Sequence, residues 1–459
     1  MVVPPLQHSM NGLQRRRYSG GGSSRMPISK VALITRMSTQ NAGNEALSIE
    51  LINFFKRELP NAEIRAMDRY PRFFEHLKIA HLQAGGGSLI QAFDALADRL
   101  LARFSPSPQP NLAPLADERL VRLDQTAKEL TGRLRQIKRA IALRQNLARL
   151  GLIGRDEVAR TFDTCRWSDL LVWNPAGEFH PTGNPDQTFR LLLILRIAQR
   201  LGKRTAIINH SIEISDPRLR ELVKHVYCNA DYVGVRDAQS VQEALKLGVE
   251  AGRIHESPDL VFLASIPDAI KIAPADAIPE GAIGISINGL EAMRGQDEWD
   301  DFFARIKTLG REFVYLSNAM NHDLELAHQF AARHGGIVIE RQPTYRELRG
   351  FYGRMGVLVS SRLHASILAL CEGTPVISIE PSVFKLTAIF EQMNYSIPTD
   401  NLAHAGWWKR LSTHVEQALL DRGTLSNVGA KALALQVQRI HGAYERLFYL
   451  ARPRVSEAI

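Results

Sequence analysis

The chain has 459 residues and a formal net charge of +9 at pH 7, with 45% hydrophobic and 23% charged residues. This length predicts two or three domains, and this composition excludes a mainly disordered or fibrous chain. No apolar run reaches the roughly 18–20 residues that cross a bilayer, and no secretory signal is recognisable. The three cysteines are far apart, which favours a reducing compartment and no cysteine-built metal site. We therefore expect a cytoplasmic protein.

The N-terminal segment 1–28 is rich in Arg, Ser and Gly and contains no acidic residue. Such a segment cannot bury a core, so we predict a disordered extension. A transit peptide and a true start at Met26 are open alternatives. The positive charge of the whole chain suggests an anionic partner, and composition does not choose between nucleic acid, an acidic membrane surface and a phosphorylated substrate.

Residues 29–265 alternate between short apolar runs and helical patterns, which is typical of a parallel α/β sheet. The runs that predict strands are 31–34, 63–67, 79–83, 169–173, 205–209 and 232–235. The helical patterns that follow several of them are 46–58, 187–201 and 239–247. We expect one doubly wound, Rossmann-like domain here.

The segment at about 98–160 does not fit this alternation and is predicted to be a helical insertion. A Pro/Ser-rich patch opens it at 105–114, and seven basic residues without an acidic one follow within 132–155. Apolar residues at helical spacing make this part a basic amphipathic helix. It could contact an anionic membrane surface, or it could pack on the first domain with its arginines solvated.

Residues 266–280 contain three prolines among small residues and are predicted to be a linker. The alternation resumes in 281–459, with strands expected at 283–287, 312–316, 336–339, 356–359 and 375–379. The sequence therefore predicts two doubly wound Rossmann-like domains that face each other across a cleft. Ligands of such sheets bind beyond the C-terminal ends of the strands.

The most informative stretch is 357–370, where a buried strand leads through a two-serine turn into a helix. Ser360 or Ser361 is expected to cap that helix. Its free amides favour an anion, Arg362 is a bidentate partner for phosphate or carboxylate, and His364 exchanges protons near neutral pH. The alternative is an ordinary capped helix with a solvated arginine and a packed histidine.

Other polar residues follow predicted strands in both domains. Arg236 follows the strand at 232–235, and Lys385 follows the strand at 375–379, although a solvated surface lysine is an alternative. Gly- and Asn-rich loops lie at 41–45, 85–88 and 174–180. Such loops offer the mixed donors and acceptors that sugar hydroxyls require, and ordinary tight turns explain them as well.

Several motifs are absent from the sequence. It contains no P-loop, dinucleotide fingerprint, HExxH or GxSxG motif, and no D-x-D pair that would hold a metal on a nucleotide diphosphate. We therefore predict neither a cofactor nor a metal. The basic insertion lacks interleaved aromatic residues, so we do not expect a nucleic-acid partner.

Three C-terminal pieces belong together: SRLHA at 361–365, GTPVI at 373–377, and Lys385. They resemble the C-terminal signature of the polysaccharide pyruvyl transferase family. RDAQS at 236–240 with the later Pro258-Asp259, and NAGNEAL at 41–47, are similar to its central region and N-terminal loop. The resemblance runs from about 31 to 385 without the insertion, and it implies a two-domain fold like that of GT-B glycosyltransferases.

The chain departs from the family at three points. The family often has Asp where Asn44 stands, a glycine-rich run where NPAGE stands at 174–178, and a Tyr where Glu380-Pro381 stands. The last two positions are expected to touch substrate, so the acceptor does not follow from the resemblance.

The family's activity would be transfer of a pyruvyl group from phosphoenolpyruvate to two hydroxyls of a sugar. The resemblance implies that His364, Arg362 and Arg236 are catalytic, with His364 as the general acid/base. The residues expected to bind the donor are Arg236, Ser361, Arg362, Leu363, His364 and Lys385. The residues expected to bind the saccharide acceptor, which could be lipid-linked, are Asn41, Gly43, Asn44, Glu45, Glu178, His180 and His210. A lipid-linked acceptor would bring the protein to the inner face of the membrane.

The sequence is compatible with two other functions. A nucleotide-sugar glycosyltransferase would have the same fold class, and a non-catalytic binder of anionic glycans could keep the same two-domain shell.

Overall fold

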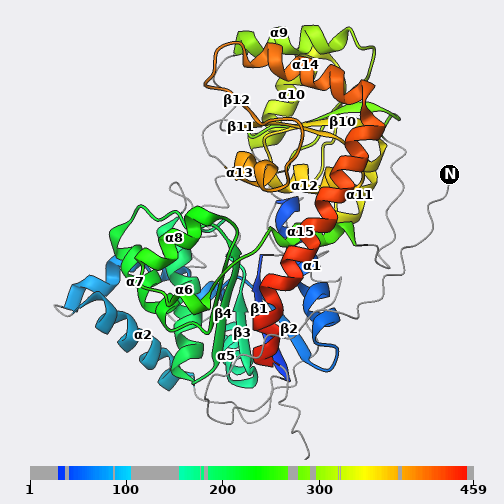
Figure 1. The fold of residues 1–459 in the computed structure, drawn as a ribbon. Helices are drawn as coiled ribbons and strands as arrows, with labels where there is room; N and C mark the ends of the chain where they lie inside the picture. The colour runs from blue at the N-terminus through cyan, green and yellow to red at the C-terminus, as the bar shows by residue number, and fades with distance from the viewer. Residues whose placement is uncertain are drawn as a thin grey trace, which may run out of the picture.

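Two parallel sheets, one in each domain, make up the centre of the molecule (Figure 1). The computed structural model describes residues 29–36, 41–85, 88–104, 155–175, 177–179, 184–266, 278–289, 296–318, 320, 322–380 and 385–451. Within them the first sheet has six strands in the order β2-β1-β3-β4-β5-β6, and the second has six in the order β12-β11-β10-β7-β8-β9. This confirms the predicted two-domain Rossmann-like fold.

The strands of both sheets follow the apolar runs of the sequence. Those of the first sheet are β1 (Lys30–Thr35), β2 (Glu63–Asp68), β3 (Leu170–Trp173), β4 (Arg204–His210), β5 (Tyr232–Val235) and β6 (Ile254–Glu256). Those of the second are β7 (Ala282–Ser286), β8 (Phe313–Tyr315), β9 (Ile337–Val338), β10 (Met355–Ser360), β11 (Val376–Glu380) and β12 (Asp400–Asn401). The short edge strands β6 and β12 were not predicted.

One predicted strand is wrong. The run 79–83 belongs to a 3₁₀ helix, η2 (Ile79–Gly85). Ile79 and Leu82 are buried while Ala80 and His81 are exposed. Burial at a spacing of three fits the 3₁₀ repeat, whereas a strand that is buried on one face would bury alternate residues.

The helices cover the sheets on both faces. Those of the first domain are α1 (Ala42–Glu58), α2 (Leu89–Arg103), α5 (Arg155–Trp167), α6 (Pro185–Arg200), α7 (Pro217–Cys228) and α8 (Ala238–Lys246), with the 3₁₀ helices η1 (Arg72–His76), η3 (Ala251–Arg253) and η4 (Leu260–Ser265). The helices after the linker are α9 (Gln296–Lys307), α10 (His322–His334), α11 (Tyr345–Arg354), α12 (Leu363–Cys371), α13 (Lys385–Gln392), α14 (Trp407–Leu420) and α15 (Arg422–Ala451).

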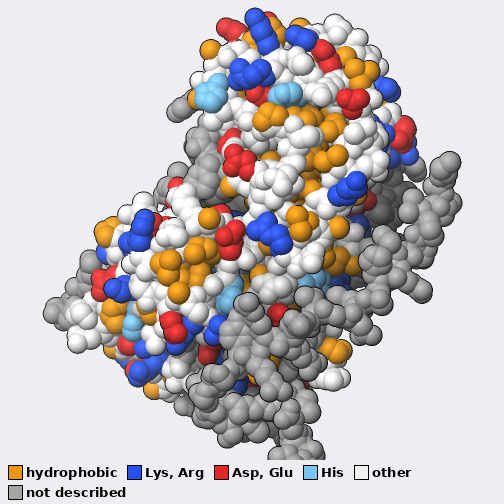
Figure 2. Space-filling view, viewed as in Figure 1, with side chains coloured by type: hydrophobic (Ala, Val, Ile, Leu, Met, Phe, Trp, Pro, Cys, Tyr) orange, Lys and Arg blue, Asp and Glu red, His pale blue; other side chains and the backbone are white. Residues whose placement is uncertain are grey.

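Three predicted segments lie largely or wholly outside the described residues. They are the extension 1–28, the insertion apart from its two ends in α2 and α5, and most of the linker. The proposed membrane contact at 132–155 belongs to this group. In the described part of the chain, no helix is both long enough and apolar enough to cross a bilayer. On the face seen in Figure 2, the described acidic and basic side chains are intermixed over both domains.

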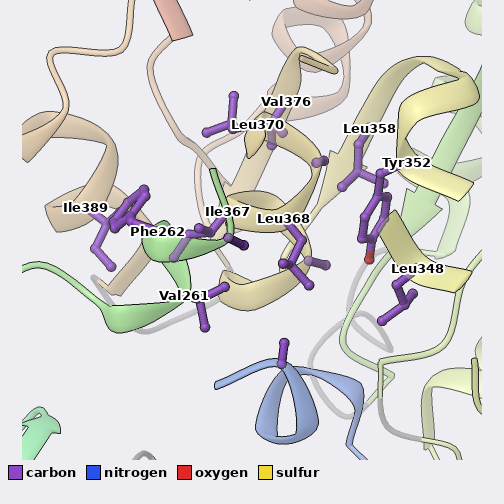
Figure 3. Close-up of a cluster of buried hydrophobic side chains, with 14 of the residues drawn as sticks. Val261, Phe262, Leu348, Tyr352, Leu358, Ile367, Leu368, Leu370, Val376 and Ile389 are labelled. Atoms are coloured by element: carbon purple, nitrogen blue, oxygen red, sulfur yellow. The ribbon is translucent and has the colours of Figure 1, made fainter. Parts of the chain in front are cut away.

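The two domains share one hydrophobic core. Figure 3 shows Val261 and Phe262 of η4, in the first domain, beside Ile367 of α12, in the second. The long helix α15 crosses from the second domain to the first (Figure 1). There Tyr444 packs edge-on against Phe54, with ring centroids 5.5 Å apart. Because η4, α1 and α15 join the same buried cluster, the two domains are held together by packing at their junction.

Candidate active site

The C-terminal edges of the two sheets meet at this junction. Asn41 caps α1, since its side-chain oxygen accepts from the amides of Gly43 and Asn44 at 3.0 and 3.3 Å. The same turn bonds to Asn318, which lies beyond β8: the Ala42 amide donates to the Asn318 carbonyl at 3.3 Å. The start of α1 therefore sits directly on the second domain. We call the group Gly43, Arg236, Asp259, Arg362 and His364 the junction site.

Three of these residues form a chain of polar contacts across the junction. Arg236 follows β5, and its Nη1 donates to Asp259 Oδ2 at 2.7 Å. His364 of α12 approaches the same oxygen with Nε2, at 3.5 Å. The side chains of Arg236, Asp259 and His364 are 6%, 0% and 12% exposed. A carboxylate of the first domain is thus shared by a guanidinium of its own domain and an imidazole of the other.

The Asp259 carboxyl is ionised in this setting. Burial by itself raises its pKa, but the nearby charges of His364 and Arg236 outweigh burial and hold the pKa of Asp259 well below its usual range. The Val261 amide also donates to Asp259 Oδ1, at 2.9 Å. Asn209, which has a left-handed φ of 57°, accepts from the Leu260 amide at 2.9 Å. The loop that carries Asp259 is therefore fixed from several sides.

Gly43 packs against the ring of His364. A Cβ atom placed on Gly43 would lie 2.3 Å from His364 Nδ1 and 2.7 Å from His364 Cβ. Real Cβ atoms do not come this close, so only glycine allows this approach of backbone to ring. The two nitrogens of His364 consequently face different groups: Nε2 faces Asp259, and Nδ1 faces Gly43.

Arg362 is oriented by a second buried carboxylate. Its Nε donates to Asp323 Oδ2 at 2.9 Å, its Nη2 also contacts Asp323 Oδ1, and Nη2 donates to Asn288 Oδ1 at 3.1 Å. The side chain of Asp323 is 1% exposed, and that of Arg362 is 19% exposed. Asp323 and Asn288 thus fix the position of the guanidinium at the start of α12.

The predicted serine cap of α12 is wrong. Arg362 occupies the N-cap position, and no side chain caps the helix. Ser360 accepts instead from the Arg362 amide at 3.0 Å, and Ser361 accepts from the Asn288 amide at 2.7 Å. The first amides of α12 therefore have no side-chain acceptor, which suits an anion beside Arg362.

The other predicted donor-binding residues, Leu363 and Lys385, lie at the starts of α12 and α13. Leu363 begins α12 and is partly buried against the core. Lys385 begins α13, which follows β11 at the same edge of the second sheet. Glu380 accepts from the Leu386 amide at 3.2 Å and from the Thr387 hydroxyl at 2.6 Å, so it holds the start of α13 in place.

The predicted acceptor residues divide into separate groups. Asn41, Gly43 and the buried Asn44 shape the first turn of α1. Glu45 is half-buried against the start of α11 and accepts from the Tyr345 amide, and burial raises its pKa. His180 lies outside the described residues.

His210 does not face the junction site. It is fully buried, with Nε2 bonded to the Tyr227 hydroxyl at 2.8 Å and its ring beside Phe179. Burial, together with the nearby charge of Arg236, lowers the pKa of His210 to about 3, so it stays neutral. Because its side chain packs in the core beneath the sheet, we leave it out of the acceptor site.

Glu178 lies in a second polar group, at the ends of β1 and β3. Arg36 Nη1 is 3.0 Å from Glu178 Oε1, and Gln187 Nε2 donates to Glu178 Oε2 at 2.7 Å. The Glu178 side chain is 4% exposed. Burial raises its pKa, although the charge of Arg36 opposes that rise. We call Arg36, Glu178 and Gln187 the crevice cluster, because sheets of this order bind ligands where β1 and β3 diverge.

Sequence reasoning missed Asp259 and Asp323 as partners of the site. Pro258-Asp259 was noted in the sequence without a role, and Asp323 carried no signal, because its partner Arg362 is 39 residues further along the chain. Among the described residues, no group of three or more His, Cys, Asp or Glu could hold a metal ion.

Comparisons with known proteins agree with this arrangement. A family model described as polysaccharide pyruvyl transferase matches residues 41–382, a range that contains the whole junction site. No curated protein sequence gives a significant match.

Solved structures share the fold. The chain is similar to a protein from Listeria monocytogenes described as a UDP-N-acetylglucosamine 2-epimerase, with 12% identity, a TM-score of 0.52, and coverage of 93% of this chain and 98% of that one. Another UDP-N-acetylglucosamine 2-epimerase gives 11% identity and a TM-score of 0.50, covering 92% and 97%. At such identities the likeness concerns the fold alone.

Proposed function

The chain belongs to the polysaccharide pyruvyl transferase family, and on this premise we propose that it transfers a pyruvyl group from phosphoenolpyruvate to two hydroxyls of a saccharide. The products are a pyruvate ketal and phosphate. The observation that carries the proposal is the pairing, at one junction, of an uncapped helix start beside Arg362 with a histidine held against an ionised carboxylate.

The donor carries a phosphate and a carboxylate. We place one of these anions at the start of α12, where Arg362 and the first helix amides can hold it. Lys385 at the start of α13 would supply a further cation. Arg236 is only 6% exposed and donates to Asp259. We therefore propose that Arg236 acts through Asp259 rather than on the donor directly.

His364 would transfer protons in the reaction. One proton is added to the methylene carbon of the donor, which makes its C2 electrophilic and open to attack by a sugar hydroxyl. Attack by the second hydroxyl on the same carbon closes the ketal ring and expels phosphate. Of the two hydroxyl protons released, one balances the proton given to the methylene carbon and the other leaves with phosphate. Such acid–base catalysis contributes about 10²–10⁴-fold to a rate.

The acceptor would lie on the first domain. The first turn of α1 and the crevice cluster offer amide, carboxylate and guanidinium groups of the kind that bind sugar hydroxyls. A saccharide of an exopolysaccharide precursor, free or on a lipid carrier, fits this chemistry. A lipid-linked acceptor would be met at the cytoplasmic face of a membrane.

The test offers the purified chain phosphoenolpyruvate or a panel of nucleotide sugars, first by thermal shift and then with saccharide acceptors. We expect stabilisation by phosphoenolpyruvate, acceptor-dependent phosphate release, and the mass gain of one ketal on the acceptor. Transfer from a nucleotide sugar would replace the proposal with a glycosyltransferase. Glycan binding without turnover of any donor would indicate a non-catalytic binder.

A further inference from the structure

We infer that Asp259 is a positioning residue which fixes one tautomer of His364, with the proton on Nε2, and that Nδ1 is the atom which exchanges protons with substrate. The second half of this inference rests on the proposed function. The first half concerns the resting protein and stands apart from it.

The Nε2 side of the ring is determined by the chemistry of its neighbour. Nε2 lies 3.5 Å from Asp259 Oδ2, and the carboxylate is completely buried. An ionised carboxylate can only accept hydrogen bonds. A ring nitrogen that faces it is stabilised when it carries a hydrogen, because two lone pairs would otherwise oppose each other. Arg236 donates to the same oxygen at 2.7 Å, so the carboxylate lies between an arginine of its own domain and the histidine of the other.

The Nδ1 side of the ring has a different neighbour. The backbone of Gly43 passes so close that a Cβ atom there would be 2.3 Å from Nδ1. With Nε2 protonated, Nδ1 carries the second proton of the imidazolium and can give it to the methylene carbon. In the neutral ring that remains, Nδ1 has a lone pair and can take a proton from the attacking hydroxyl. Gly43 therefore covers this side of the ring with backbone alone, and Nδ1 is assigned to substrate because Nε2 is turned to a buried carboxylate.

The groups that surround the ring are a carboxylate, two arginines and a phenol. Asp259 is the near charge, and Arg236 is one step further away, on the far side of that carboxylate. Tyr444 from α15 is buried, and burial raises its pKa so far that it keeps its proton. Arg362, two residues before His364, is paired with Asp323. Asp259 is therefore the group whose removal changes the ring most.

A second histidine provides a matched control. His414 lies on α14, and its Nδ1 is 3.1 Å from Asp400 Oδ2. Arg410 donates to the other oxygen of Asp400 at 2.9 Å. An Arg–Asp–His set therefore occurs beside β12 as well as at the junction. The ring nitrogen that faces the carboxylate is opposite in the two sets, so His414 serves as the reference for the other tautomer.

The test is an NMR titration of the full chain labelled with ¹⁵N in its histidine rings, in which His364→Gln assigns the His364 signals. We expect the neutral ring of His364 to carry its proton on Nε2 and that of His414 on Nδ1. In Asp259→Asn the apparent pKa of His364 should fall by about 1–3 units, the usual effect of one close opposite charge. Asp400→Asn should change His414 only.

The outcomes separate the two claims. A neutral His364 with its proton on Nδ1, in the wild-type chain, overturns the tautomer without any variant. An unchanged His364 pKa in Asp259→Asn overturns the role of Asp259, provided that an unaltered His414 titration shows the variant folded.

A kinetic measurement then tests the role of Nδ1. If the protein turns over phosphoenolpyruvate, the limb of the kcat–pH profile that depends on His364 should move in Asp259→Asn by the same amount as the pKa. If Asp259→Asn keeps the wild-type kcat and its limb does not move, Nδ1 is not the atom that exchanges protons with substrate. Absence of turnover by the wild type contradicts the proposed function but not the tautomer.

Discussion

The junction site and the crevice cluster are built from the same kind of groups, but their surroundings shift the pKa of the acid in opposite directions. Each places an arginine against a nearly inaccessible carboxylate at the C-terminal edge of the first sheet. At Asp259 the charges of His364 and Arg236 outweigh burial and lower the pKa. At Glu178 burial outweighs the charge of Arg36 and raises the pKa. The same pairing of an arginine with a buried acid thus gives opposite pKa shifts, because Asp259 has two positive neighbours and Glu178 is governed by burial.

The two groups also differ in how they are assembled. The crevice cluster comes entirely from the first domain, whereas the junction site exists only while His364 of α12 sits on Asp259 and Gly43. Changes at the junction should therefore affect both folding and turnover, and changes in the crevice should affect the acceptor.

Arg236→Ala should lower the free energy of unfolding by about 3–5 kcal/mol, because it leaves Asp259 charged and buried without its guanidinium partner. Urea unfolding at pH 7 measures the loss. The matched control is Arg305→Ala, whose ion pair with Glu416 is 40% and 32% exposed. That change should cost about 0–1 kcal/mol. Equal losses in the two variants would show that the junction pair contributes no more than a surface pair.

Gly43→Ala should reduce kcat by at least about 100-fold, because the new methyl group must displace the His364 ring that supplies the proton transfer. Steady-state phosphate release is the measurement. Gly442→Ala in α15 is the control, since a Cβ there meets nothing within 4 Å. Turnover by Gly43→Ala at the wild-type rate would place the reacting group elsewhere.

Glu178→Gln should raise the acceptor KM roughly tenfold, the effect of losing one hydrogen bond to a charged group, and should leave the donor KM unchanged. Initial rates over both substrate concentrations separate these terms. Glu63→Gln, at an exposed carboxylate paired with Arg65, is the neutral control. A change confined to the donor KM would assign Glu178 to the other substrate.

The contribution of Asp259 to the free energy of unfolding should depend on pH. Its pKa is lower in the folded chain than in the unfolded one, so the stability it supplies is present above about pH 4 and is lost as the pH falls through the folded value. The difference in unfolding free energy between the wild type and Asp259→Asn should therefore be largest near pH 7 and should shrink below about pH 4. A difference that grows on acidification would contradict the lowered pKa.

The sequence was sufficient for features that depend on local pattern. Buried strands are visible in the sequence as apolar runs. In a parallel sheet the residues that follow the strands lie at the same edge of the sheet. For this reason Arg236, Arg362 and His364 could be selected as candidates. It failed where local signals are ambiguous. The run at 79–83 fits a 3₁₀ spacing as well as a strand, and β6 and β12 are only three and two residues long.

The contacts that define the site are long-range and left no local trace. Asp259 and His364 are in different domains, and Gly43 meets His364 although more than 300 positions separate them. From the sequence, Gly43 is explained by the backbone geometry of a helix start. In the structure, glycine is required there because the His364 ring packs against it. His210 shows the opposite error: it follows a strand as expected, but its side chain packs in the core with Tyr227 rather than at the junction.

The most direct test of the account compares the wild type with His364→Gln at saturating phosphoenolpyruvate and acceptor. Phosphate release gives kcat, and calorimetric titration with phosphoenolpyruvate alone gives donor affinity. We expect a kcat at least about 100-fold lower in the variant with a donor Kd near the wild-type value, because the anion is held by Arg362 and the start of α12. A variant with wild-type kcat, or one that fails only by losing the donor, would contradict proton transfer by His364.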